Sequence, residues 1–257
     1  MLLRRVIDHV KTQNWTAVAL DFVIVVVGVF IGIQVANWND RGAQMRLGHE
    51  YKNRITADLL RDLETYHIQA GYYGVVLESV LEADRLLSEP NPDPRAVVIA
   101  AYRASEIINE SANRATWEQV VSSGHLGLLP AYALENGLAD YYRYDESTID
   151  SFQLLQDSPY RRMVRSIIPL PIQLDIRSGC SDVVDDINII SGFVARCELT
   201  VDDQVLAEIA AALSRSETLK ANLRYQFSLV SNIEANAKGN IELVQRVLTA
   251  LDAAGSR

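Results

Sequence analysis

Residues 15–38 read WTAVALDFVIVVVGVFIGIQVANW, and this stretch decides how the N-terminal part of the chain folds. As a helix it spans about 35 Å, enough to cross a hydrocarbon core of about 30 Å. Residues 22–33 carry no charge and are mostly Val and Ile. Because a backbone in lipid must satisfy its own hydrogen bonds, helix is the expected state despite these β-branched residues. The sequence therefore predicts a transmembrane helix at residues 15–39, with the lipid bilayer as its surroundings.

The flanks of this stretch indicate how the helix is anchored. Trp15 and Trp38 stand at its two ends, where an apolar ring with a polar N–H suits the headgroup layer. Residues 2–11, LLRRVIDHVK, alternate apolar and charged side chains at helical spacing. This pattern predicts an amphipathic interfacial helix at residues 1–14, with Arg4 and Arg5 as further interfacial anchors.

A cleaved signal peptide, with Arg4 and Arg5 as its charged region, is the main alternative. Two features argue against it: Asp21 opens the apolar run, and no small-x-small cleavage site follows it. A buried core strand is also considered, but the run is far too long for one. A retained anchor is the favoured interpretation.

One face of the predicted span is unusually small and polar. At 100° per residue its members include the following positions: Asp21, Val25, Gly28, Gly32 and Val35. The two glycines form a GxxxG motif, which lets helices approach closely, and an ionisable residue in a span usually faces protein. This transmembrane association face predicts a homodimer or a complex with another membrane protein. The alternative is that the motif occurs by chance and that Asp21 merely sits at the interface.

The orientation of the chain depends on its cysteines, because Lys and Arg flank the span about equally on both sides. Cys180 and Cys197 are the only cysteines and lie in one loop-like segment. Such a pair indicates a possible disulfide and hence an oxidising compartment, although two buried free thiols remain the alternative. The sequence therefore predicts a cytoplasmic N-terminus and a periplasmic domain.

Residues 40–257 have the pattern of a helical extramembrane domain. Apolar positions recur in steps of three and four up to Ser88, where SEPNPDP turns the chain. We expect further helices at about 94–112, around Trp117 and over 134–155, and a last one that follows a capping box at 214–217. The first and last helices should pack antiparallel. The expected fold class is all-α, an elongated antiparallel helical bundle that continues from the transmembrane helix.

Residues 169–199 interrupt the helical pattern. Pro169 and Pro171 predict an extended stretch, so this segment is expected to be one irregular loop excursion, with room for a short helix. The paired tyrosines at 72/73 and 141/142 are expected to place one ring in the core and one at the rim. They also leave a small-molecule pocket possible.

Composition and motifs exclude several functions. The formal charge of −9 belongs to residues 41–257, because residues 1–40 balance, and an acidic domain without a basic cluster predicts no nucleic-acid partner. Glu64 and His67 have the Glu-x-x-His spacing of di-iron bundles, but a second such motif is missing, so no metal site is expected. Residues 122–125, SSGH, lack the frame of a nucleophile elbow. We therefore expect no catalytic residues and no cofactor.

Two segments carry a family resemblance. The span ends in a Gln-x-x-Asn-Trp-Asn signature (residues 34–39), and TWEQVVSSGHLGLLP (116–130) is followed by LADYYRYDE (138–146). In these segments the chain resembles a family of uncharacterised bacterial single-span membrane proteins with a domain of unknown function. The resemblance implies a single-span protein with a helical domain of unknown function, and it supplies no catalytic residues. The expected location is the bacterial inner (plasma) membrane, with a single pass.

These observations predict a membrane-anchored, non-enzymatic module that acts as a scaffold, accessory subunit or interaction protein through helix packing. The alternative is a periplasmic ligand-sensing domain that signals through a partner protein, because the sequence contains no recognisable cytoplasmic output domain.

Overall fold

The structure, a computed structural model, describes residues 15–108, 111–180, 182–184, 190–194 and 197–253. The described residues are all-α apart from one two-stranded sheet, which confirms the expected fold class. Two compact units divide the chain, Met1–Tyr51 and Lys52–Arg257. The expected interfacial helix at residues 1–14, with Arg4 and Arg5, lies outside the described residues.

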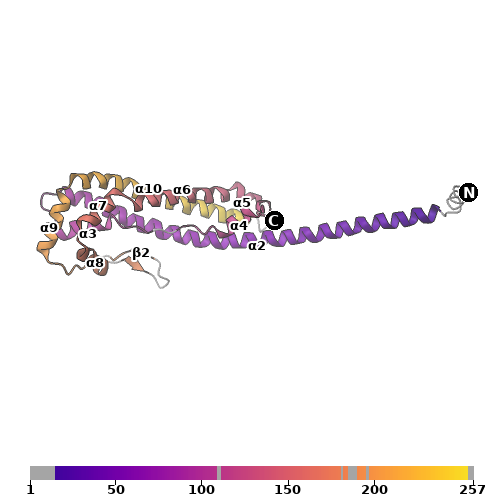
Figure 1. Ribbon diagram of the computed structural model, residues 1–257, viewed down its shortest axis with the longest axis horizontal. Coiled ribbons are helices and arrows are strands. Elements are labelled where there is room, and N and C mark those ends of the chain that lie inside the picture. The colour runs from indigo at the N-terminus through magenta and orange to yellow at the C-terminus, as the bar shows by residue number, and fades with distance from the viewer. Residues whose placement is uncertain (1–14, 109–110, 181, 185–189, 195–196, 254–257) are drawn as a thin grey trace, which may run out of the picture. The chain divides into compact units, whose positions relative to one another are not determined.

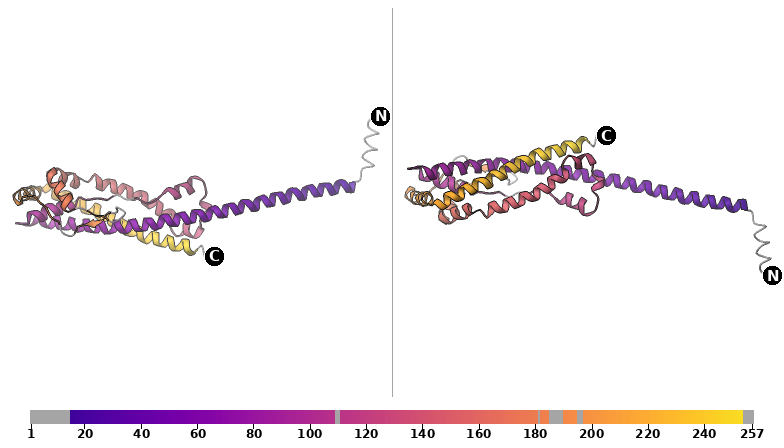
Figure 2. Two further views of the ribbon diagram at one scale, coloured as in Figure 1. Left: turned by 90° about the horizontal axis from the view of Figure 1, so that it is seen from below. Right: turned by 90° about the horizontal axis from the view of Figure 1, so that it is seen from above.

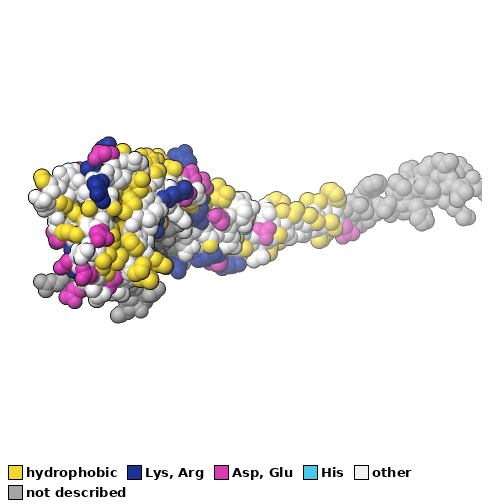
Figure 3. Space-filling model, turned by 60° about the vertical axis from the view of Figure 1, so that its left-hand side comes forward, with side chains coloured by type: hydrophobic (Ala, Val, Ile, Leu, Met, Phe, Trp, Pro, Cys, Tyr) yellow, Lys and Arg dark blue, Asp and Glu magenta, His cyan; other side chains and the backbone are white. Residues whose placement is uncertain are grey.

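Helix α2 (Trp15–Ser88) is continuous over 74 residues and ends at Ser88, where the sequence predicts its end. Its N-terminal part is the one described segment long and apolar enough to cross a membrane. The apolar side chains there are exposed, about half or more of each being accessible, and nothing in the described part of the chain covers them (Figure 3). A surface of this kind is expected against lipid or another apolar partner and not against water.

The long helices of the second unit form an antiparallel bundle, as predicted. Helix α10 (Glu217–Ala253) runs opposite in direction to α6 (Leu138–Gln156) and to the part of α2 in this unit (Figures 1 and 2). It packs along α6 and also against α7 (Pro159–Ile167) and α5 (Ala131–Glu135). Apolar positions of α10 at steps of three and four, from Leu219 to Leu251, face the core.

Shorter elements complete this unit. Helices α3 (Pro94–Arg103) and α9 (Asp203–Ser214) pack against each other. The remaining elements are α4 (Ala115–Ser122), the 3₁₀ helix η1 (Leu126–Leu128), α8 (Leu170–Gly179) and the strands β1 (Asp182–Val184) and β2 (Ile190–Phe193). The two strands are antiparallel, with Asp182 opposite Phe193.

The helix expected at 94–112 is shorter than predicted and ends at Arg103. Side chains from other elements bind the carbonyl groups that a longer helix would have used. Gln226 Nε2 donates to the Ala104 oxygen at 2.9 Å, and Tyr73 Oη donates to the Ile108 oxygen at 2.5 Å. Because tertiary partners satisfy these backbone groups, the chain can leave the helix without leaving buried polar atoms unpaired.

The single helix expected over 134–155 is also wrong, because α5 and α6 are separate. Gly137 lies between them with φ +104°, a left-handed conformation that glycine adopts without strain. A Cβ at this position would also come within 2.9 Å of Leu243 Cδ1. The break is therefore fixed both by backbone geometry and by the packing of α10.

The segment 169–199 contains more regular structure than expected. Pro169 caps α8 and Pro171 lies in its first turn, so the prolines start a helix and do not force an extended stretch. The prediction of a capping box at 214–217, with Ser214 as the capping residue, is wrong. Ser216 Oγ, and not Ser214, accepts the bond from the Leu219 N–H at 3.2 Å, while Ser214 is the last residue of α9.

Both members of each tyrosine pair are buried, which corrects the expectation of one core and one rim residue. Tyr72 packs against the Phe193 ring at 5.0 Å between centroids, and Tyr142 stacks on Trp117 at 4.7 Å. The positions expected at the rim are thus covered by β2 and α4, two elements that are separated in sequence from the tyrosines they contact.

Candidate functional site

The predicted transmembrane association face is open in the structure. Asp21 is exposed, and Val25 and Val35 are 63% and 57% exposed. A Cβ added at Gly28 or Gly32 would meet no atom within 4 Å. None of the described residues therefore fills the space beside the two glycines.

Of the two tryptophan anchors, the side chain of Trp15 lies outside the described side chains. Trp38 is 77% exposed, which leaves its ring free to contact a headgroup layer.

Cys180 and Cys197 form a disulfide in the structure, with their Cα atoms 4.6 Å apart. Next to it, Gly179 passes very close to the backbone of Glu198, whose N–H donates to the Gly179 oxygen at 3.4 Å. A Cβ on Gly179 would lie 1.9 Å from the Glu198 oxygen, so only glycine fits. The disulfide and this close backbone contact hold the segment that contains the two strands at the end of α8.

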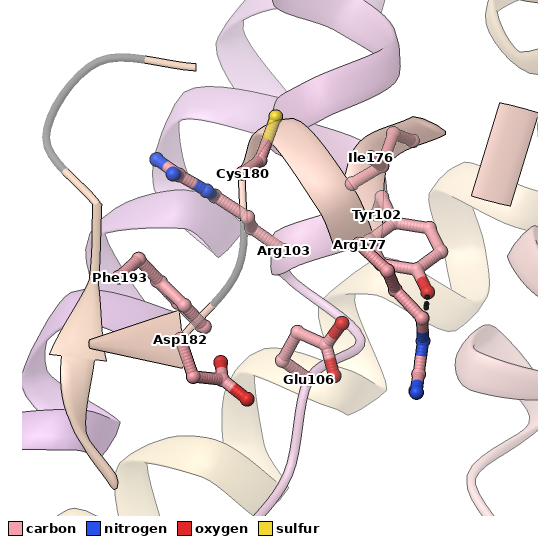
Figure 4. A pocket seen from close by; sticks show the side chains of 8 residues that line it. All are labelled: Tyr102, Arg103, Glu106, Ile176, Arg177, Cys180, Asp182 and Phe193. Carbon is pink, nitrogen blue, oxygen red and sulfur yellow. Dashed lines mark hydrogen bonds between the residues drawn. The ribbon is translucent and has the colours of Figure 1, made fainter. Parts of the chain in front are cut away.

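A cavity of about 130 Å³ lies beside this disulfide (Figure 4). Three parts of the chain line it: the end of α3 with the residues after it, the last turns of α8, and the two strands. The lining residues are Tyr102, Arg103, Glu106, Ile176, Arg177, Cys180, Asp182 and Phe193. Four of these eight carry a charge, two of each sign, which is unusual for so small a cavity.

Arg103 is held in place on one side of the cavity. Its Nη2 donates to the Val194 oxygen at 2.7 Å, and its guanidinium lies 5.1 Å from the centre of the Phe193 ring. The Nε atom is buried and has no hydrogen-bond partner among the described residues. Burial lowers the pKa of Arg103, although the carboxylates of Asp182 and Glu106 oppose this effect.

Arg177 and Glu106 are bound to neighbouring side chains. Arg177 Nε donates to Tyr102 Oη at 3.1 Å, a bond drawn in Figure 4. Glu106 forms a shielded ion pair at 3.0 Å with Arg165, whose guanidinium also lies 3.6 Å above the Tyr102 ring. The charge of Glu106 is thus largely balanced outside the cavity.

Asp182 projects from β1 toward Glu106 (Figure 4). No ion pair joins it to any of the residues that the structure describes. Burial raises its pKa, the nearby charge of Glu106 adds to this rise, and Arg177 and Arg103 oppose it. Among the described residues, three charged groups that line the cavity form no ion pair: the guanidinium groups of Arg103 and Arg177 and the carboxylate of Asp182.

A second polar cluster lies inside the bundle, where α2, α4 and α6 meet. Asp62 accepts bonds from Tyr141 Oη at 2.7 Å and from the Asn113 N–H at 2.8 Å. Asp58 accepts a bond from Thr116 Oγ1 at 2.5 Å. Burial raises the pKa of Asp62, whereas these two bonds lower it. Asp58 also pairs with Arg61 on the same helix at 2.8 Å. The bonds from Tyr141, Asn113 and Thr116 join different parts of the unit, so the cluster holds them together in its interior.

Arg114 balances the third carboxylate of this cluster, Asp145. Its Nη1 lies 3.1 Å from Asp145 Oδ2 and donates to the Tyr142 oxygen at 2.7 Å, while Nη2 pairs with the exposed Glu146 at 2.7 Å. Asp145 also accepts a bond from Tyr66 Oη at 3.2 Å.

Glu64 and His67, the Glu-x-x-His pair, are both exposed on α2. Within the described ranges, no three His, Cys, Asp or Glu side chains come together in a way that could hold a metal ion.

Comparison with known proteins gives no relative for this fold or site. No protein-family model matches the chain, and neither a curated protein nor a solved structure matches it. The resemblance to the family of bacterial single-span proteins stays a prediction that rests on the residues of the two quoted segments.

Sequence reasoning missed most of the cavity. It singled out Cys180 and Cys197, which lie at its edge, but not Arg103 or Asp182, which give it its charge. The described tyrosine pairs do not line it; Tyr102 does. The one usable signal was the cysteine pair, because a disulfide brings together residues on either side of it.

Proposed function

We propose that this protein is a membrane-anchored, non-enzymatic module that works as a scaffold or accessory subunit through helix packing. The observation that carries the proposal is the open face at Gly28 and Gly32, in a helical segment whose apolar side chains no other described residues cover. Small residues let a second helix approach closely enough for backbone and side-chain dispersion contacts.

The extramembrane bundle supports such a role. α2 continues without a break from the apolar segment to Ser88, and side chains on its later turns form part of the core of the bundle. A change in association of the apolar segment can thus be transmitted along one continuous helix, since a helix is a stiff element.

The orientation is also a proposal: a cytoplasmic N-terminus, a single pass of a bacterial inner membrane and a periplasmic bundle. The disulfide between Cys180 and Cys197 supports it, because such bonds persist in oxidising compartments. Thiol labelling of denatured protein from cells, with and without reductant, tests this step. Labelling without reductant would place the domain on the reducing side.

The proposed association is tested by replacing Gly28 and Gly32 with Ile in the full-length chain. A Cβ at either position meets nothing within 4 Å, so the substitutions do not disturb the packing of the chain itself. They should therefore act only on a partner helix. Val26→Leu and Phe30→Leu, on the opposite face, are the matched controls.

Single-cysteine crosslinking in membranes provides the measurement. Crosslinks should form at positions 28 and 32 and be much weaker at 26 and 30. In a second measurement, a reporter cysteine replaces Val25, and its crosslinks should be lost when Gly28 and Gly32 are replaced with Ile. Crosslinks to a second copy indicate a homodimer, and crosslinks to a different protein indicate an accessory subunit. Equal crosslinking around the helix would refute the proposal.

A further inference from the structure

The cavity beside the disulfide is lined by charged side chains that form no direct ion pair in the described part of the chain. Arg103 and Asp182 both line it, both are partly buried, and neither forms an ion pair among the described residues. Burying a charge without a partner is costly, so such groups usually have a ligand or a counter-charge.

The cation in the cavity is positioned to receive an anion. The Val194 carbonyl and the Phe193 ring fix the guanidinium of Arg103, yet its buried Nε–H donates to nothing in the described chain. Arg177 lies across the cavity, and Tyr102 is its one hydrogen-bond partner among the residues that the structure describes. A planar guanidinium that is held but has spare N–H donors matches the geometry of a carboxylate.

The anionic groups exclude a simple anion as the ligand. Asp182, which lies near Glu106 at the cavity, would repel phosphate or sulfate (Figure 4). The two guanidinium groups would in turn repel a metal cation. A ligand that carries both charges would match both Arg103 and Asp182.

We propose that this cavity binds a small zwitterionic amino acid, with its carboxylate on Arg103 and its ammonium group on Asp182. Burial raises the pKa of Asp182 and lowers the pKa of Arg103, and the opposite charges at the cavity offset these shifts only in part. This inference is independent of the transmembrane association face and gives the ligand-sensing alternative a definite site.

The size of the cavity limits the ligand. A volume of about 130 Å³ corresponds to roughly four water molecules at about 30 Å³ each. Glycine, alanine and serine are of this size, whereas tryptophan is much too large. The apolar walls at Ile176 and Phe193 leave room for a methyl group beside the charged ends.

Calorimetric titration of the full-length protein in detergent micelles tests the proposal. The probes are glycine, alanine and tryptophan, with propionate, ethylamine and inorganic phosphate as ligands that have only one kind of charge. Glycine or alanine should bind. Propionate and ethylamine should each bind at least about tenfold more weakly, because each lacks one charge-assisted contact.

Two variants separate the charged ends of the ligand. Arg103→Gln should weaken alanine binding about tenfold or more and leave ethylamine unchanged, and Asp182→Asn should weaken alanine but not propionate. Arg143→Gln and Asp140→Asn, which break an exposed ion pair on α6, are the controls and should have no effect. Circular dichroism verifies that each variant is folded.

Four results would overturn the proposal. They are no binding of glycine or alanine at millimolar concentration; phosphate, propionate or ethylamine binding as tightly as alanine; tryptophan competing with alanine; or cavity variants that behave like the controls. If a cavity variant does not fold, the comparison of ligands on the wild-type protein still decides between a zwitterion and a singly charged ligand. None of these results bears on crosslinking at Gly28 and Gly32, so the two proposals fail separately.

Discussion

Replacing Arg114 with Gln should destabilise the bundle far more than replacing Arg143 with Gln, although both arginines pair with an aspartate. The partner of Arg114 is Asp145, whose side chain is 3% exposed, and Arg114 itself is 19% exposed. Arg143 and its partner Asp140 are 69% and 54% exposed. The two pairs therefore differ mainly in how well water screens them.

The structure gives the magnitude. At 3.1 Å, a unit charge pair has an attraction of about 5 kcal/mol at an effective dielectric constant near 20. Without Arg114, the buried Asp145 keeps only its bond from Tyr66 and loses its counter-charge. Removing one partner of a buried pair costs about 3–5 kcal/mol, and the remaining bond places the expected loss near 3 kcal/mol. The exposed pair should lose at most about 1 kcal/mol.

Urea unfolding of the full-length chain in detergent provides the assay. Trp117 stacks on Tyr142, whose carbonyl accepts a bond from Arg114, so its fluorescence reports on this part of the bundle. Trp117 is one of three tryptophans, and Phe at positions 15 and 38 leaves it as the only one. The free energy of unfolding is then compared between the two variants.

A double variant adds a sharper test. Arg114→Gln with Asp145→Asn removes both charges, so it should be more stable than Arg114→Gln alone, because no uncompensated carboxylate remains. If Arg114→Gln costs no more than Arg143→Gln, or if the double variant is the less stable, the buried pair does not act as described.

Two further predictions concern single residues. Burial raises the pKa of Asp62, so the folded chain binds a proton on this carboxylate more tightly than the unfolded chain does. The contribution of Asp62 to stability should therefore be greatest below its ordinary pKa near 3.8. It should fall as the pH rises through the raised pKa of the folded state. Asp62→Asn should flatten that fall in unfolding free energies measured at a series of pH values, and an unchanged profile would contradict the assignment. Gly179→Ala should lower the free energy of unfolding by roughly 3 kcal/mol or more, because the added Cβ would overlap the Glu198 oxygen. Gly127→Ala is the control: a Cβ there meets nothing within 4 Å, so the loss should be about 1 kcal/mol or less in the same measurement.

Local sequence determined those helices whose signal is contained in a short stretch of the chain. The apolar run from Phe22 to Ile33 and the apolar spacing up to Ser88 predict one long helix, and the structure has it. The spacing from Leu219 to Leu251 predicts the last helix in the same way. These patterns are reliable because a helix repeats every few residues, so a short window contains the whole signal.

Tertiary contacts decided where other helices end. The spacing of apolar residues gave no reason for the chain to leave a helix at Arg103, because the side chains that bind the following carbonyls, Tyr73 and Gln226, lie on α2 and α10. The break at Gly137 likewise depends on the packing of Leu243. A window of local sequence does not contain these partners.

The cavity shows the same division. The sequence identified Cys180 and Cys197 as a pair, because cysteines are rare in this chain. It could not place Arg103, on α3, beside Asp182, on β1, since nothing in their spacing relates them. Only folding brings these two charges together in one small, poorly solvated cavity. Because a buried charge without a partner is costly, a ligand with a charge of each sign could match them.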